Sequence, residues 1–280
     1  MIEKEAHHLQ IFVLIFWICT VAHDRLQTAA MVIPEKKIVF VRHGCTYINE
    51  YLGENPWGSP HFSDIFPDDD ICEQYYRDTP LSPFGVKQAA QLLGKSKPEF
   101  LERCELIVTS PLRRALQTLD YGLRPHLLAD ACRHIPIIAL PEAAERLYMI
   151  SEIGRHVNDI KQEFDYVDFE TGFDGKPLDK WWYEPADVTN YVEWRPVGQG
   201  QRWACPGEPE DHFNDRMTRL YQWLHHRPEQ HVTVVCHWGV ISWMLDMDFD
   251  NCQWKEVAWK NIRPKALQTH LLTNSIGRSR

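Results

Sequence analysis

An arginine and a histidine stand side by side at Arg42 and His43, and Gly44 follows them. A neutral imidazole is a nucleophile and a guanidinium is a fork-shaped donor for phosphate oxygens, so this pair could attack and hold an anionic group. The run before them, Ile38–Val41, is apolar and mostly β-branched, which is typical of a strand buried on both faces in a parallel sheet. By themselves these residues fit a strand that ends in a surface turn equally well, because a short motif has many chance matches.

A third basic residue, Arg114, follows another short apolar run. The pattern predicts a strand at Glu105–Thr109. Ser110 suits the N-cap of a helix and Pro111 suits its first position, so a helix should start directly after the strand. Arg114 would then lie about one turn into this helix, near the positive N-terminus where anions bind.

A second histidine, His237, ends a third strand-like run. The β-rich residues His231–Val235 precede it, and Gly239 follows two positions later. The carboxyl ends of parallel strands meet at one edge of an open α/β sheet, where ligands bind. Two arginines and two histidines that converge on this edge would make a phosphate site.

The chain resembles the histidine phosphatase superfamily, also called the phosphoglycerate mutase-like family, in several separate motifs. They occur in the family's order and cover about Val32 to Asn274, which is a stronger signal than Arg-His-Gly alone. The matching stretches are Arg42–Thr46 with Asn49, Asp78–Gly85, Ser110–Ala115, Pro206–Glu208 and Cys236–Gly239.

The resemblance implies a fold, a reaction and roles for individual residues. The expected fold is a three-layer α/β/α sandwich with a mostly parallel central sheet. The expected reaction is hydrolysis of a phosphomonoester, in a small molecule or a protein, through a phosphohistidine on His43. Arg42, Arg114 and His237 would hold the phosphoryl oxygens, and Asn49 would add a hydrogen bond. No metal or organic cofactor is implied.

The mechanism also needs a carboxylic acid that protonates the leaving alcohol. Two candidates, Glu142 and Glu145, follow a predicted strand at Ile135–Leu140, and spacing alone does not separate them. Glu142 follows the strand end, where the sheet opens. Glu145 begins a Glu-Arg-Leu-Tyr stretch that resembles the acid-bearing stretch of eukaryotic mutase-like members, and an acidic residue and a glycine follow at Glu152 and Gly154, as in that group. The resemblance favours Glu145.

Two alternative functions stay open. A phosphoglycerate mutase-type phosphotransferase would carry Glu-Arg-His-Tyr-Gly where this chain has Glu145–Met149, and usually glutamate where this chain has Cys45. Both departures favour hydrolysis. A non-catalytic binding protein of the same fold is the other alternative, and it is disfavoured because all the core residues are present.

Composition narrows the possible partners. A net charge of −9 argues against nucleic acid and anionic membrane surfaces, so the phosphate site must be a local positive pocket. The eight cysteines form no Cys-x-x-Cys pair and suggest buried thiols in a reducing, cytoplasmic setting. The histidine pairs His7-His8 and His225-His226 are adjacent in sequence and do not face one ligand on a helix, so a metal site is not expected.

The residues before the first strand are interpreted as an extension, 1–30. Leu9–Ala22 is nearly all apolar but shorter than a membrane span, and the acidic Glu3 and Glu5 do not suit the start of a signal peptide. A signal peptide, an anchor and a surplus segment before a start at Met31 stay open. The phosphatase domain is expected over 31–280, with an insertion near 151–203.

Periodicity predicts the remaining elements. Helices are expected at Ser82–Leu93 and Asp211–His226 and a last strand at His270–Thr273. Glu50–Arg77 fits a long loop over the site. The aromatic residues of Ser151–Trp203 would either form a cap that shapes substrate choice or, as we favour, simply pack the insertion onto the body.

Overall fold

The computed structural model describes residues 35–56, 59–61, 75–130, 134–184 and 207–264. The chain divides into two compact units, 1–35 and 36–280. The apolar stretch Leu9–Ala22 and the predicted strand His270–Thr273 lie outside the described residues. Within the described ranges, no helix has both the length and the apolar character needed to cross a membrane.

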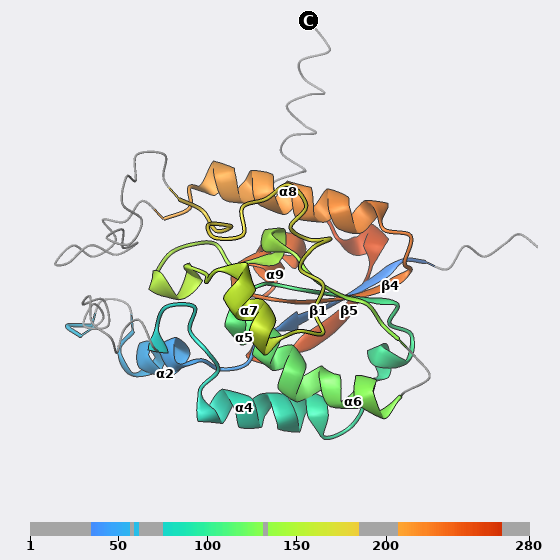
Figure 1. Ribbon diagram of the computed structural model, residues 1–280, viewed down its shortest axis with the longest axis horizontal. Coiled ribbons are helices and arrows are strands. Elements are labelled where there is room, and N and C mark those ends of the chain that lie inside the picture. The colour runs from blue at the N-terminus through green and yellow to red at the C-terminus, as the bar shows by residue number, and fades with distance from the viewer. Residues whose placement is uncertain (1–34, 57–58, 62–74, 131–133, 185–206, 265–280) are drawn as a thin grey trace, which may run out of the picture. The chain divides into compact units, whose positions relative to one another are not determined.

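A five-stranded sheet forms the centre of the described part of the chain, in the order β3-β2-β4-β1-β5 (Figure 1). Four strands are parallel, and the edge strand β5 runs antiparallel to β1. The expected α/β fold with a mostly parallel sheet is confirmed. The strands are β1 (Lys37–Arg42), β2 (Leu106–Thr109), β3 (Ile137–Ala139), β4 (His231–Cys236) and β5 (Trp254–Ala258).

Four of these strands agree with the strands predicted from the sequence, and β5 was not predicted. The residues Trp254–Ala258 mix charged and apolar side chains and are exposed or half-buried, because an edge strand has one free side. They therefore lack the buried, mostly apolar and β-branched run that marks β1 and β4. The predicted strand at Ile135–Leu140 is shorter in the structure, at Ile137–Ala139.

The core lies on both faces of the sheet because side chains alternate along each strand. In β1, Val39 and Val41 pack into one buried cluster, and Ile38 and Phe40 pack into the other. Full burial of each such side chain contributes about 1.5–3 kcal/mol. The central strands therefore need helices on both faces, as the apolar run before Arg42 indicates.

Helices cover the two faces as separate layers (Figure 1). One face carries α8 (Glu210–His226) and α9 (Trp238–Leu245), whose apolar sides join Ile38 and Phe40. On the other face lie α4 (Pro83–Ala89), α5 (Arg113–Thr118) and α6 (Arg124–Ala129), with π-helical turns at Ala90–Gly94 and Leu119–Leu123. Shorter elements are α2 (Tyr47–Glu54), α7 (Val157–Glu163) and 3₁₀ turns at Glu99–Glu102, Pro141–Ala143, Ile150–Glu152 and Trp259–Asn261.

Two predicted helix starts have different outcomes. Ser82 caps α4 as expected, because its side chain accepts a hydrogen bond from the Gly85 nitrogen. The predicted start at Ser110 is wrong, because α5 begins at Arg113. The Ser110 hydroxyl accepts instead from the Leu112 nitrogen at 3.1 Å and stabilises a tight turn before the helix.

The predicted loop Glu50–Arg77 is wrong at its start, which belongs to α2. Thr46 and Asn49 form a reciprocal capping box there, and this side-chain pair supports a helix that the apolar pattern does not reveal. Within the segment predicted to be an insertion, Trp181 and Trp182 are 9% and 8% exposed and pack into the core, as expected, and both also line the pocket described below. The other aromatic residues beyond 184 lie outside the described residues.

Candidate active site

Two histidines meet at the carboxyl edge of the sheet. Arg42 and Cys236 are register partners at the ends of β1 and β4, so the next residues, His43 and His237, leave the sheet side by side. Their ring centroids are 5.1 Å apart, and both side chains are buried. The convergence that the sequence predicted at this edge therefore exists for the two imidazoles.

The His43 ring is held in one tautomer. Its Nδ1 lies 2.7 Å from the Gly44 carbonyl oxygen, which can only accept, so Nδ1 carries the proton and Nε2 keeps a lone pair. Burial, followed by the charges of Arg114 and Arg42, holds the pKa of His43 well below its ordinary value. The ring is therefore neutral at neutral pH, as a nucleophile requires.

The His237 ring is buried with neither nitrogen hydrogen-bonded among the described residues. Burial, then the neighbouring Arg114 and His43, holds its pKa well below the ordinary value. A buried polar group without a partner is costly unless a ligand or water satisfies it. The ring could therefore accept or donate one hydrogen bond to a bound group between the two histidines.

The two arginines reach this edge from different elements. Arg42 Nη1 donates to the Phe249 carbonyl oxygen, and Arg42 Nε is buried without a hydrogen bond among the described residues. Arg114 is 3% exposed, and its Nη1 donates to the Ser151 carbonyl oxygen at 2.7 Å. Arg114 Nη2 lies 3.3 Å from Glu152 Oε1. The Arg114 fork is thus oriented from the segment just before α7.

Asn49 has a structural task in α2. Its Oδ1 accepts from the Thr46 nitrogen at 3.2 Å, and its own backbone nitrogen donates to Thr46 Oγ1 at 3.1 Å. The side-chain oxygen is therefore used in the helix cap. A hydrogen bond from Asn49 to phosphate would have to come from its amide nitrogen.

The structure separates the two acid candidates. Both oxygens of Glu145 lie 3.1 Å from the Gly239 nitrogen, in the first turn of α9 just after His237. A Cβ at position 239 would collide with Glu145 Oε1, so only glycine allows this approach. Glu142 instead forms ion pairs with Lys176 at 2.7 Å and with Arg219 at 3.9 Å.

Several supporting residues escaped the sequence analysis. Thr118 Oγ1 accepts from the Gly44 nitrogen at 2.8 Å, and Asn251 Nδ2 donates to the His43 carbonyl oxygen at 2.9 Å. Glu152, which the sequence indicates only through its resemblance to a family motif, contacts Arg114. These contacts join residues more than 35 positions apart, and no local spacing reveals them.

Arg216 of α8 clamps the segment that carries both acid candidates. Its Nη1 donates to the carbonyl oxygens of Glu142 and Ala144 at 2.9 and 2.7 Å, and its Nη2 donates to that of Glu145 at 3.1 Å. The Glu208 carboxylate is 3% exposed and binds the same guanidinium. In the sequence, the Pro206–Glu208 motif is the only indication of this ion pair. It contains Glu208, and no motif contains Arg216.

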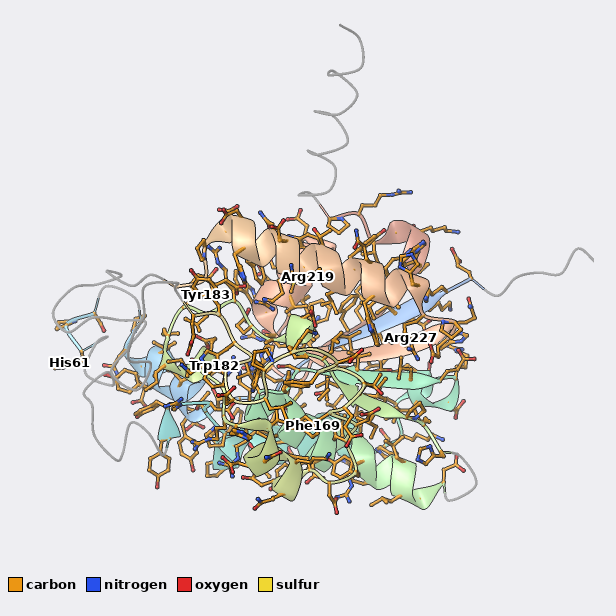
Figure 2. The ribbon with its side chains drawn as sticks, turned by 45° about the horizontal axis from the view of Figure 1, so that its top comes forward. His61, Phe169, Trp182, Tyr183, Arg219 and Arg227 are labelled. Atoms are coloured by element: carbon orange, nitrogen blue, oxygen red, sulfur yellow. The ribbon has the colours of Figure 1, made fainter. Side chains whose placement is uncertain are left out.

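A pocket of about 560 Å³ has Glu145 and Glu152 in its wall, and it adjoins the two histidines only through these carboxylates, since Glu145 contacts Gly239 and Glu152 contacts Arg114. Figure 2 shows Trp182 and Tyr183 on the segment near α8, and Arg219 on α8 itself. All three also line the pocket. Within the described ranges, no group of three or more histidine, cysteine or acidic side chains is arranged to hold a metal ion.

Comparisons with known proteins give a family model that spans most of the chain and a relative that matches about half of it. The family model of the histidine phosphatase superfamily (branch 1) matches residues 38–269. Over 135 residues the chain is 30% identical to a probable phosphatase of Schizosaccharomyces pombe, and the match covers 48% of this chain and about half, 52%, of that relative.

Two solved structures also align with the chain. One is a putative alpha-ribazole-5'-P phosphatase from Escherichia coli, at 20% identity and a TM-score of 0.43, covering 79% of this chain and 89% of that one. The other is a phosphoglycerate mutase from Thermus thermophilus, at 17% identity and a TM-score of 0.37, covering 80% and 93%. Because the family model spans well over half of the sequence, this chain belongs to the histidine phosphatase superfamily, branch 1.

Proposed function

We propose that this protein hydrolyses a phosphomonoester, in a small molecule or a protein, through a phosphohistidine on His43. The observation that carries the proposal is the hydrogen bond between His43 Nδ1 and the Gly44 carbonyl oxygen. It leaves the Nε2 lone pair available on a ring whose lowered pKa keeps it neutral. Membership of the superfamily supports the same chemistry.

In the first step, His43 Nε2 attacks phosphorus and the bond to the leaving oxygen breaks. A carboxylic acid gives its proton to that oxygen, and the alcohol departs. In the second step, the carboxylate takes a proton from water, and the resulting hydroxide attacks the phosphohistidine. The P–N bond breaks, and inorganic phosphate and neutral His43 are regenerated.

We assign the carboxylic acid to Glu145. The Glu145 carboxylate accepts a hydrogen bond from the nitrogen of Gly239, which is the second residue after His237. Glu142 instead forms ion pairs with Lys176 and Arg219. A proton donor must lie within hydrogen-bond reach of the leaving oxygen, and that oxygen must be near the two histidines. Glu145 meets this requirement better than Glu142.

Arg42, Arg114 and His237 would stabilise charge on the equatorial oxygens as the transition state forms. The buried Arg42 Nε and the two His237 nitrogens have no hydrogen bond among the described residues, which supports a role in holding a phosphoryl group. Asn49 would add its amide nitrogen. No step of this scheme needs a metal or an organic cofactor.

The test is to trap the covalent intermediate. The wild-type protein is mixed with a phosphomonoester, quenched under alkaline conditions that preserve phosphohistidine, and analysed by mass spectrometry. Phosphate on His43 together with release of inorganic phosphate is expected, and His43→Ala should lose both. His226→Ala is the control, since His226 is exposed at the end of α8.

The same assay separates the alternatives. A phosphoglycerate mutase would isomerise 3-phosphoglycerate in the presence of a bisphosphoglycerate primer and release little phosphate. A non-catalytic binding protein would bind phosphate or vanadate without forming phosphohistidine. Turnover retained at the wild-type rate by His43→Ala would reject the proposal.

A further inference from the structure

We propose that the pocket beside Glu145 receives the leaving alcohol and that Glu142 makes it selective for alcohols without a second anionic group. The inference rests on the proposed function and deepens it by naming a substrate class. It assigns a task to Glu142 other than proton transfer.

The pocket borders the proposed acid, where the leaving group is expected to lie. The phosphoryl group would sit between the two histidines, and the leaving oxygen must face the acid. Glu145 and Glu152 both line the pocket, and Glu152 also contacts Arg114. The part of the substrate beyond the leaving oxygen would therefore extend into this cavity of about 560 Å³.

The described wall of the pocket has no surplus of positive charge. Five carboxylates and four permanently charged cations line it, and each cation has a carboxylate partner. Arg216 pairs with Glu208 at 2.6 Å, and Lys180 pairs with Glu184 at 3.4 Å. A site for an anionic alcohol would instead present a cation without a carboxylate partner.

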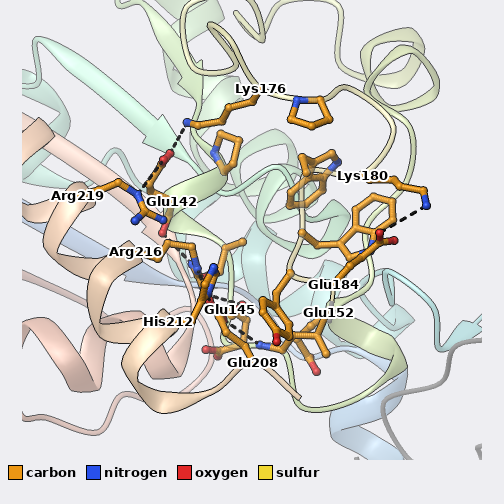
Figure 3. Close-up of a pocket in the computed structure, with 17 residues that line it drawn as sticks. Glu142, Glu145, Glu152, Lys176, Lys180, Glu184, Glu208, His212, Arg216 and Arg219 are labelled. Atoms are coloured by element: carbon orange, nitrogen blue, oxygen red, sulfur yellow. Dashed lines mark hydrogen bonds and ion pairs between the residues drawn. The ribbon is translucent and has the colours of Figure 1, made fainter. Parts of the chain in front are cut away.

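Glu142 neutralises two of the four cations. Its carboxylate stands between Lys176, on the segment after α7, and Arg219 on α8 (Figure 3). The Glu142 side chain is 11% exposed, against 31% for Lys176 and 53% for Arg219. Without this carboxylate, two cations would face the pocket and would attract a second anion.

The rest of the wall suits an uncharged or cationic group. Trp181, Trp182 and Tyr183 supply aromatic surface, which favours rings and cations over anions. Lys180 and Glu184 pair on the side of the pocket across from Glu142 (Figure 3). An aromatic alcohol without an acidic substituent therefore fits the chemistry of this cavity.

The experiment uses three aryl phosphates of similar size on the full-length protein. They are phenyl phosphate, para-carboxyphenyl phosphate and para-(aminomethyl)phenyl phosphate. Each kcat/KM is divided by the uncatalysed hydrolysis rate of the same ester, which removes differences in leaving-group reactivity. The carboxylated ester should be used about tenfold less efficiently than phenyl phosphate at low ionic strength, and the aminomethyl ester at least as well.

Variants test the role of Glu142 in this selectivity. For each variant, the normalised kcat/KM of the carboxylated ester is divided by that of phenyl phosphate. Glu142→Gln should raise this ratio about tenfold, because it leaves the charges of Lys176 and Arg219 without a carboxylate partner. Arg219→Gln, at an exposed side chain, should lower the same ratio and provides a second measurement if Glu142→Gln folds poorly. Glu170→Gln is the matched control, because Glu170 pairs with Lys161 at an exposed site that does not line the pocket.

The outcomes separate this inference from the proposed function. Equal use of the carboxylated and unsubstituted esters by the wild type, or a ratio that neither variant shifts, would overturn the selectivity and leave the phosphohistidine mechanism standing. Absence of turnover with all three esters, together with absence of phosphohistidine, would reject both. A ratio that moves in opposite directions in Glu142→Gln and Arg219→Gln supports the inference.

Discussion

Arg216 holds the Glu208 carboxylate through a two-pronged ion pair, with Nε at 2.9 Å from one oxygen and Nη2 at 2.6 Å from the other. Hydrogen bonds from Arg216 and His212 keep the pKa of Glu208 below its ordinary value against the effect of burial. Nη1 of Arg216, and Nη2 in addition to its bond with Glu208, donate to carbonyl oxygens of the segment that carries Glu145. The pair therefore positions the proposed acid without touching the reacting atoms.

Arg216→Lys should misplace the segment that carries Glu145, because an ammonium cannot serve the carboxylate fork and three carbonyl oxygens together. We expect kcat for alkyl phosphates to fall about tenfold, with a much smaller loss for p-nitrophenyl phosphate, which needs less protonation of its leaving group. Arg227→Lys is the control, because Arg227 forms a similar fork with Glu229 beyond α8. Equal losses for both kinds of ester would indicate a structural role only.

His237→Ala should leave a slow enzyme that still forms phosphohistidine. It removes one stabilising contact among several, and such a loss lowers kcat by about 10²–10³. Single-turnover rates of phosphohistidine formation measure this effect. If His237→Ala formed no phosphohistidine at all while remaining folded, His237 would be needed for the covalent step itself.

Arg42→Lys and Arg114→Lys should both weaken inhibition by inorganic phosphate or vanadate, by about tenfold, since an ammonium lacks the bidentate fork. Arg113→Lys is the control next in sequence, because Arg113 pairs with the partly exposed Glu163. The measurement is the inhibition constant of vanadate. Unchanged inhibition in Arg114→Lys would remove Arg114 from the phosphate site.

Glu145→Gln should slow the hydrolysis of alkyl phosphates by about 10²–10⁴ and that of p-nitrophenyl phosphate far less. A poor leaving alcohol needs a proton, whereas p-nitrophenolate departs without one. Glu142→Gln should show no dependence on leaving-group basicity, although we expect it to change selectivity for charge. The leaving-group dependence measured in each variant distinguishes the two, and the opposite pattern would transfer the acid role to Glu142.

Asp78 should make the stability of the protein depend on pH. Burial raises the pKa of Asp78 to about 7, and hydrogen bonding from the Arg113 nitrogen at 2.9 Å only partly opposes this. Between pH ~4 and ~7 the unfolded chain ionises Asp78 while the folded protein keeps the proton. The preference of the folded protein for protonated Asp78 therefore contributes to its stability. This contribution is fully present below the pKa of Asp78 in the unfolded chain and is lost as pH rises through about 7.

Asp78→Asn, which keeps the acceptor for the Arg113 nitrogen, should remove that dependence. The difference in unfolding free energy between the wild type and the variant should change by on the order of 3 kcal/mol across this pH range. Urea denaturation at a series of pH values measures it. A constant difference between pH 4 and pH 8 would contradict the raised pKa.

Local chemistry in the sequence determined the strands that end in the site and the side chains they deliver. The run before Arg42 is continuously apolar, and the run before His237 is apolar apart from Thr233; their burial on both faces requires a central position in a parallel sheet. Ser82 likewise identified the start of α4. These signals involve residues close together in sequence, so a single chain suffices to find them.

Other features depend on partners far away in sequence, and only the tertiary structure decided them. The place of Glu145 depends on Gly239, and the ion pairs of Glu142 depend on Lys176 and Arg219. No spacing reveals which of two nearby carboxylates contacts Gly239, because Glu142 lies within the 3₁₀ turn Pro141–Ala143 whereas Glu145 lies beyond its end, where the backbone is extended. The neutral state of His43 also results from burial and from neighbouring arginines that folding brings together. The sequence names the reactive groups, and the packing of distant segments decides their direction and their charge.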